Sequence, residues 1–107
     1  MVIVRKKLKE TFRTITLQDF FNILKKENNC CSHGGYSAKN GMTVEMDAVT
    51  VTIKNGYLGL GESRQDIRIY FPLRSISRIV VEEDSRDPED TAYLVYLKDG
   101  SNIVLAF

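Results

Sequence analysis

The stretch that decides the fold is residues 48–81, AVTVTIKNGYLGLGESRQDIRIYFPLRSISRIVV. Its first part alternates apolar and polar residues on both sides of Asn55-Gly56, the favoured pair for a two-residue hairpin turn. That turn places Ile53 opposite Leu58 on one face of the hairpin. Glycines alternate with leucines in the returning strand, so the other face can curve or lie close to a second backbone.

The second part of this stretch predicts a third strand and a sharp corner. Residues 67–71 alternate apolar and polar side chains, and Pro72 ends the strand because it cannot donate a ladder hydrogen bond. Leu73 and Ile76 then fit a single helical or 3₁₀ turn, after which residues 77–83 resume as a strand. Residues 82–90 contain six acidic side chains and Pro88 and are predicted to form an exposed acidic loop.

The last segment, residues 92–107, is predicted to be a second hairpin around Asp99-Gly100. A two-residue turn there places Tyr96 opposite Ile103 and Leu94 opposite Leu105. Apolar residues then occupy both faces, which is typical of a strand pair that is covered by the core on one side and by a helix or subunit on the other.

Upstream, a strand with one basic face is predicted from residue 2 to residue 13. Its apolar side is Val2, Val4, Leu8 and Phe12, and its basic side is Arg5, Lys7, Lys9 and Arg13. These four cations are candidate partner-binding residues, either for phosphates or for the acidic loop. The alternative is a solvated edge strand, in which the lysines prevent pairing with a further strand.

An amphipathic helix is predicted from Leu17 to Glu27, with Thr16 as N-cap and apolar residues at helical spacing. Residues 28–41 are rich in Asn, Ser and Gly and are predicted to be a loop. The apolar positions change from even to odd numbers at Asp47 and Ala48, so a bulge or bend is expected there.

Length and composition favour one soluble domain. The chain has 107 residues, of which 43% are hydrophobic, enough for one core. Its formal charge of +1 indicates no particular class of partner. The charge is unevenly distributed, because residues 1–54 carry 9 basic and 5 acidic side chains, whereas residues 55–107 carry 6 basic and 9 acidic ones. We expect a single domain over residues 1–107, cytoplasmic and without membrane insertion, in which residues 1–47 attach to a core β region, residues 48–107.

The only residues of catalytic or metal-ligating type that cluster in sequence are Cys30, Cys31 and His33. Adjacent cysteines cannot easily bridge each other, and this spacing supplies at most three of the four ligands of a structural zinc site. We expect an ordinary loop here, and keep metal or thiol chemistry as an alternative. Because His33 is the only histidine and no carboxylate pair stands out, we expect no enzyme and no cofactor.

Residues 50–105 resemble the bacterial PH-like domains. The resemblance rests on the Asn55-Gly56 hairpin, on the corner Phe71-Pro72-Leu73-Arg74-Ser75-Ile76-Ser77-Arg78-Ile79, and on a following hairpin with Asp-Gly. It implies a small barrel that binds protein or lipid, and it transfers no catalytic residues.

A second resemblance is to the bacterial Sm-like RNA chaperones, in which a short N-terminal helix precedes a five-stranded barrel that closes into rings. The helix is similar in Leu17-Gln18-Asp19-Phe20 with Asn22, Leu24 and Glu27. The turn Asn55-Gly56 and the strand containing Ile76-Ser77, Ile79 and Val80 are also similar. This resemblance implies RNA binding, without assigning a contact residue.

These observations together predict a mostly-β α+β fold: one N-terminal helix with a strongly curved antiparallel sheet that forms a small barrel or roll. The predicted function is a non-catalytic binding or assembly module that self-associates or binds a protein partner. Sm-like RNA binding is the first alternative, and a metal or thiol site at Cys30, Cys31 and His33 is the second.

Overall fold

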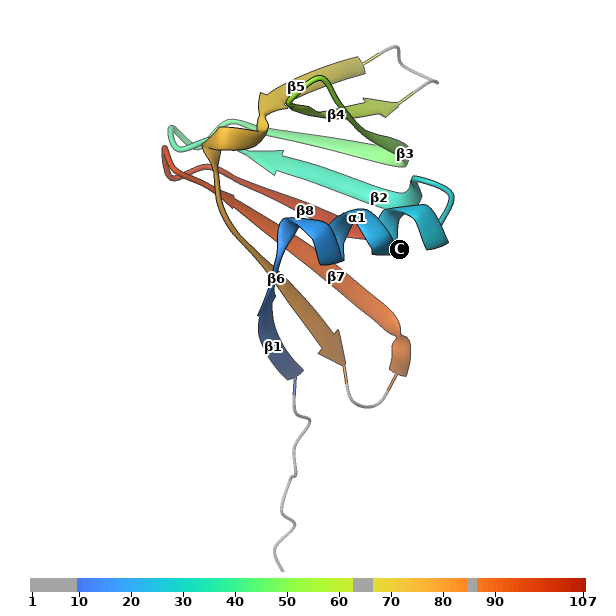
Figure 1. Cartoon of the computed structure of the whole chain (residues 1–107). Coiled ribbons are helices and arrows are strands. Elements are labelled where there is room, and N and C mark those ends of the chain that lie inside the picture. The colour runs from blue at the N-terminus through green and yellow to red at the C-terminus, as the bar shows by residue number, and fades with distance from the viewer. Residues whose placement is uncertain (1–9, 63–66, 85–86) are drawn as a thin grey trace, which may run out of the picture.

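The computed structural model describes residues 10–62, 67–84 and 87–107. The chain there forms eight strands, one α-helix and one 3₁₀ turn (Figure 1). In chain order these are β1 (Glu10–Ile15), α1 (Leu17–Lys26), β2 (Cys30–Ser37), β3 (Thr43–Lys54), β4 (Tyr57–Glu62), β5 (Ile67–Pro72), η1 (Leu73–Ser75), β6 (Ile76–Asp84), β7 (Asp87–Leu97) and β8 (Asn102–Ala106). The prediction of a mostly-β α+β fold with one N-terminal helix is confirmed.

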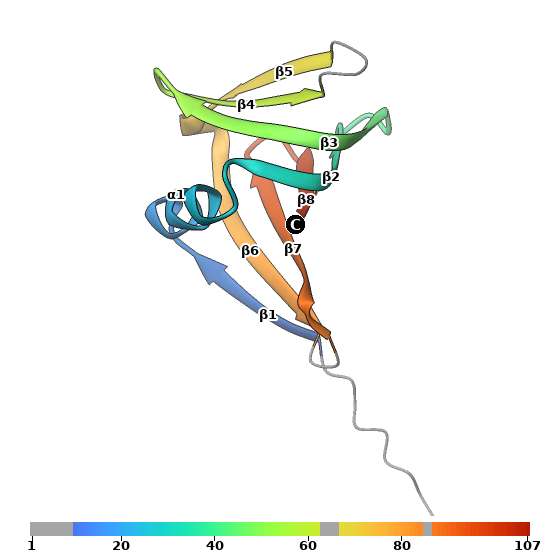
Figure 2. The same ribbon diagram turned by 90° about the vertical axis from the view of Figure 1, so that its right-hand side faces the viewer.

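The strands form one antiparallel sheet in the order β1-β6-β7-β8-β2-β3-β4-β5. Two meanders, β6-β7-β8 and β2-β3-β4-β5, are joined where β8 pairs with β2. The C-terminal meander therefore lies between β1 and β2, two strands that are close in sequence. Helix α1 connects them across one face of the sheet (Figure 2).

The expected barrel is wrong, because the sheet is neither closed nor strongly curled. Within the described ranges β1 pairs only with β6 and β5 only with β4, so the two edges of the sheet never meet. Closure would require the edge strands to hydrogen-bond to each other with a matching stagger. Here the sheet stays open, and the apolar face of α1 packs on it instead.

Helix α1 begins at the predicted cap. The Thr16 hydroxyl accepts a hydrogen bond from the Asp19 N–H (3.0 Å), and the Asp19 carboxylate accepts one from the Thr16 N–H (3.3 Å). This reciprocal pair satisfies donors that the first helical turn leaves without partners. The helix ends before Asn28 and Asn29, which both adopt a left-handed φ of 58°, a conformation that asparagine tolerates.

The core lies between α1 and the inner face of the sheet, the face that α1 covers. Fully buried side chains come from the helix and from most strands; they include Phe20, Met46, Val51, Leu58, Leu60, Ile79, Val95, Ile103 and Leu105. Cross-strand neighbours on this face form rows of mostly apolar residues, such as Ile79, Val95 and Ile103. The opposite face is called the outer face below.

The hairpin and the proline corner agree with prediction. Ile53 lies opposite Leu58, and Asn55 and Gly56 both have positive φ, as a primed two-residue turn requires. Pro72 ends β5, and the 3₁₀ turn η1 follows it before β6 begins. The Leu73 N–H donates to the Gly56 carbonyl (2.8 Å), which ties the corner to the hairpin turn.

The predicted loop over residues 28–41 is wrong, because residues 30–37 form β2, between β3 and β8. Gly34 explains how a glycine-rich segment becomes an inner strand. A Cβ at Gly34 would lie 2.9 Å from Val49 Cγ2 and 3.3 Å from Leu105 Cδ2, so no larger residue fits without displacement. Close approach of neighbouring side chains outweighs the low strand propensity of the segment.

The predicted register of the last hairpin is wrong by one residue. Val95, not Tyr96, lies opposite Ile103, because three residues, 98–100, and not two, connect the paired residues Leu97 and Ser101. A shift of one residue exchanges the faces of a strand. Residues 93, 95 and 97 are therefore buried in the core, and Leu94 and Tyr96 lie on the outer face.

The acidic loop predicted over residues 82–90 is replaced by the distal ends of β6 and β7, except for residues 85–86, which lie outside the described ranges. Strand β1 pairs with this end of β6, and Phe12 lies directly opposite Glu82. The described end of the predicted basic strand, residues 10–13, is thus a neighbour of the acidic segment in the sheet, while Arg5, Lys7 and Lys9 lie outside the described residues.

Candidate functional site

The outer face of the sheet carries a continuous row of small and apolar side chains. Direct cross-strand pairing aligns its members on five strands in the order Thr14, Val80, Leu94, Val104 and Gly35. We call this set the apolar row. Val104 remains 36% exposed and Leu94 is half-buried, whereas Val80 is only 7% exposed. No described element packs over the apolar row, because α1 lies on the inner face (Figure 2).

Two parallel rows of larger or polar residues border the apolar row. On one side, Phe12 is 56% exposed on the edge strand β1 and is followed across the sheet by Glu82 and Ala92. On the other side, the Arg78 guanidinium lies over the Tyr96 ring, with its carbon 4.8 Å from the ring centroid. An apolar centre with a polar border is an arrangement that protein-protein interfaces share.

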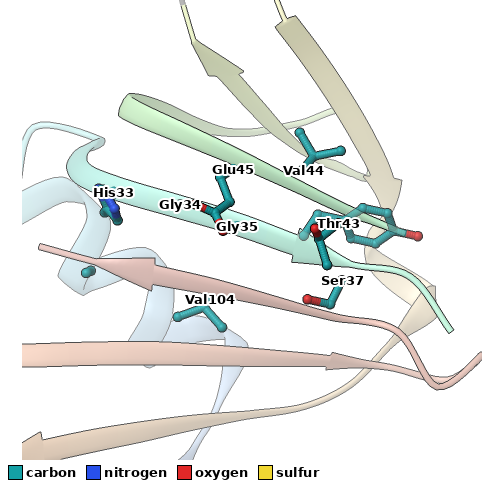
Figure 3. A pocket seen from close by; sticks show the side chains of 10 residues that line it. His33, Gly34, Gly35, Ser37, Thr43, Val44, Glu45 and Val104 are labelled. Carbon is teal, nitrogen blue, oxygen red and sulfur yellow. The ribbon is translucent and has the colours of Figure 1, made fainter. Parts of the chain in front are cut away.

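A shallow hollow of about 290 Å³ continues the apolar row onto β2 and β3 (Figure 3). Gly35 forms its floor, and Val104 and Glu45 stand on either side of it, on strands β8 and β3. A Cβ at Gly35 would meet only the Val44 carbonyl at 3.7 Å, an ordinary contact. The hollow thus arises from a missing side chain, and the face has room there for a side chain of a partner.

The three candidate metal or thiol residues lie on β2, but they do not converge. Cys31 is buried in the core, whereas Cys30 is exposed, as expected for consecutive residues of a strand. His33 Nδ1 lies 3.1 Å from Asp47 Oδ1, so the ring is directed toward β3. Within the described ranges no three His, Cys, Asp or Glu side chains are placed to share a metal ion.

Burial raises the pKa of the Cys31 thiol to about 11, and a backbone hydrogen bond from His33 has a smaller, opposing effect. A thiol with this pKa is almost entirely protonated at neutral pH, and the thiolate is the nucleophilic form. The environment of Cys31 therefore favours a structural role over nucleophilic chemistry.

Of the four basic candidates on the N-terminal strand, only Arg13 belongs to the described residues; Arg5, Lys7 and Lys9 lie outside them. Arg13 Nη2 is 3.5 Å from Glu83 Oε2 on β6, and both side chains are about half exposed. The pair joins charges from the basic and acidic halves of the sequence. An exposed pair of this kind contributes about 0 to 1 kcal/mol, so it orients the strand more than it stabilises it.

A second surface feature was not predicted from the sequence. Tyr57 and Tyr70 flank an open groove on the outer face of β4 and β5, and Lys54 of β3 also lines it. In the sequence, Arg68 and Tyr70 alternate with apolar residues, which indicated only that these two side chains face outward. Their proximity to Tyr57 depends on the register between β4 and β5.

No family model matches the chain, and no curated protein or solved structure is significantly similar to it. The resemblances to PH-like domains and to Sm-like RNA chaperones therefore stay predictions. The described residues include no helix that is long and apolar enough to span a bilayer.

Proposed function

We propose that this protein is a non-catalytic binding or assembly module, and that the apolar row binds a protein, in the first instance a second copy of the chain. The observation that carries the proposal is the alignment of Leu94 and Val104, next to the largely buried Val80, on a sheet face that no described element covers. Apolar surface of this kind is stabilised when it leaves water.

A second copy fits this face for geometric reasons. Two sheets pack face to face about 10 Å apart when small and medium apolar side chains interdigitate. Val104 projects beside the hollow over Gly35, so a two-fold arrangement can place Val104 of each copy against Gly35 of the other. The bordering charges Glu82 and Arg78 have opposite sign, which suits pairing of like faces in opposite orientations.

The edges of the sheet are less suited to extend it. Strand β5 ends in Pro72, which has no N–H to donate, and its outward side chains include Arg68. Strand β1 brings Arg13 beside Glu83, so part of the charge difference between the two halves is neutralised within the chain. These contacts favour association through the apolar row over addition of a strand at either edge.

Light scattering after size-exclusion chromatography, over a wide range of protein concentration, tests the proposal. The unmodified protein should self-associate, and Val104→Glu should remain monomeric, because the substitution places a charge in the centre of the row. Thr50→Glu, an exposed substitution on β3 outside the row, is the control and should associate normally. A protein that is monomeric at all concentrations and retains no partner in a pulldown would contradict the proposal.

A further inference from the structure

The outer face of β3, β4 and β5 holds an open groove of about 490 Å³ between two tyrosines, away from the apolar row. Its lining consists of Thr52, Lys54, Asn55, Tyr57, Gly59 and Tyr70. The Tyr57 side chain is 46% exposed and that of Tyr70 is 62% exposed. Rings of this size are usually more buried, so their exposure on one groove requires an explanation.

Gly59 determines how the Tyr70 ring lies. It is directly opposite Tyr70 on one side and Thr52 on the other. A Cβ on Gly59 would be 3.0 Å from Tyr70 Cε1 and 2.9 Å from Thr52 Oγ1. The ring therefore lies low over the glycine backbone, and much of its surface remains open to solvent.

The next cross-strand pair repeats the arrangement. Gly61 is opposite Arg68, and a Cβ on Gly61 would be 3.3 Å from an Arg68 guanidinium nitrogen. The two glycines of β4 thus allow a ring and a guanidinium to lie over the sheet side by side. Packing of an aromatic ring over a strand glycine is in itself a common structural device. That device accounts for Tyr70, but neither for the exposure of Tyr57 nor for the charge of the surface.

The charged side chains next to the groove are of one sign. Next to the groove, the outward-facing residues of β4, of β5 and of residues 50–54 of β3 include Thr50, Thr52, Lys54, Tyr57, Gly59, Gly61, Arg68 and Tyr70, whereas the exposed Glu45 and Asp47 lie farther along β3. This set contains two cations and no carboxylate. The surface is therefore complementary to an anionic ligand that also presents flat rings.

We propose that this groove binds single-stranded nucleic acid, with bases stacked on Tyr57 and Tyr70 and phosphates near Lys54 and Arg68. Aromatic side chains on an open sheet, with basic residues beside them, bind unpaired bases because every base has a stacking face. A neutral sugar or a proline-rich peptide would stack on the rings but gain nothing from the cations. A duplex would not present its bases to them.

Fluorescence anisotropy with labelled oligouridine and oligothymidine of about 12 nucleotides, a length that one such domain can cover, tests this proposal in about 50 mM salt. The unmodified protein should bind at least one of them, and the comparison of the two strands shows whether it prefers RNA or DNA. Tyr70→Ala and Tyr57→Ala should each weaken binding roughly 5- to 150-fold, and Tyr70→Phe should retain most of the affinity. Lys54→Ala should lower the salt dependence by about one phosphate contact.

Tyr96→Ala is the matched control, because Tyr96 lies on the outer face of β7 beneath Arg78 and outside the groove. It should leave oligonucleotide affinity unchanged. Thermal unfolding of each variant verifies that it is folded. Lys54→Glu tests the groove without removing a ring, and it should weaken oligonucleotide binding. The proposal is overturned if neither strand binds, or if folded Tyr57→Ala and Tyr70→Ala bind as the unmodified protein does. The proposal is also overturned if Arg13→Ala abolishes binding while the groove variants do not. It is overturned as well if the groove binds a proline-rich peptide but neither oligonucleotide.

Discussion

The carboxylate of Glu62 at the end of β4 accepts a hydrogen bond from the backbone N–H of Asp47 in β3, with Oε2 2.5 Å from the nitrogen. Glu62 is only 2% exposed, and its other oxygen is buried without a hydrogen-bond partner in the structure as described. The bond lies beside the predicted bend, where Ala48 has φ +57° and β3 changes the face that it buries. The pairing between β3 and β4 stops at Val49 and Glu62, so no backbone carbonyl of β4 lies opposite Asp47. The Glu62 carboxylate accepts the hydrogen bond from the Asp47 N–H instead.

Glu62→Ala should lower the free energy of unfolding by about 1 to 3 kcal/mol, since it leaves the Asp47 N–H without its acceptor and removes buried side-chain atoms. Urea denaturation followed by circular dichroism measures the change. Glu45→Ala removes an exposed carboxylate of β3 and should stay within about 0.5 kcal/mol of the unmodified protein. Equal stability of the Glu62 and Glu45 variants would show that water satisfies the Asp47 N–H as well as the carboxylate does.

Ala48→Gly should stabilise the protein by up to about 1 kcal/mol. Ala48 is exposed and has a left-handed φ, which costs a residue with a Cβ about 1 to 2 kcal/mol, and glycine adopts it without that cost. The larger backbone entropy of glycine in the unfolded chain offsets part of the gain. Ala92→Gly, in the extended strand β7, is the control and should destabilise. A loss of stability in Ala48→Gly would indicate that the alanine methyl group contributes packing.

Gly34→Ala should destabilise by roughly 1 to 3 kcal/mol, because the new methyl group would overlap Val49 and crowd Leu105 in the core. Gly35→Ala is a closely matched control, since its Cβ would point to the outer face with only an ordinary contact. The difference in thermal midpoint between the two variants measures the overlap. Similar midpoints would mean that β2 and β3 separate at low cost.

The two cysteines should react with Ellman's reagent at very different rates. Cys30 is exposed and should react fast at pH 8, whereas Cys31 is buried and has its pKa raised to about 11, so it should react only as the protein opens. In denaturant both thiols should react at similar rates. Two fast thiols in the native protein would contradict the position of Cys31 in the core.

The raised pKa of Cys31 also predicts how the stability of the protein changes with pH. The folded-state pKa of Cys31, about 11, lies above the ordinary value of 9.0. As pH rises, the Cys31 thiol therefore loses its proton in the unfolded chain before it does so in the folded protein. The contribution of Cys31 to the free energy of unfolding is complete below pH 9 and is lost between about pH 9 and pH 11. Cys31→Ser should remove this part of the alkaline destabilisation, measured as the difference in unfolding free energy between pH 8 and pH 10.5. An identical pH profile for Cys31→Ser would contradict the assigned pKa.

The sequence by itself determined the features that depend on neighbouring residues: the Asn55-Gly56 turn, the Thr16 cap, the corner at Pro72 and the bend at Ala48. Each follows from a backbone preference or from a hydrogen bond across a few residues, so no distant contact was needed to predict it. The register of the central hairpin followed as well, because its loop length fixes it.

The tertiary structure alone decided which strands pair, which faces are buried and whether the sheet closes. Residues 30–37 form a strand because β3 and β8 lie on both sides and Gly34 admits Val49 and Leu105. In the last hairpin the Asp99 carboxylate accepts bonds from the N–H and hydroxyl of the buried Ser101, and Lys98 donates to the distant Ser75 carbonyl. These contacts select a three-residue loop and place Leu94 and Tyr96 outside. The apolar row could not be predicted from the sequence for the same reason, because a one-residue change of register exchanges the two faces of a strand. The tyrosine groove could not be predicted because only the register between β4 and β5 brings Tyr70 near Tyr57.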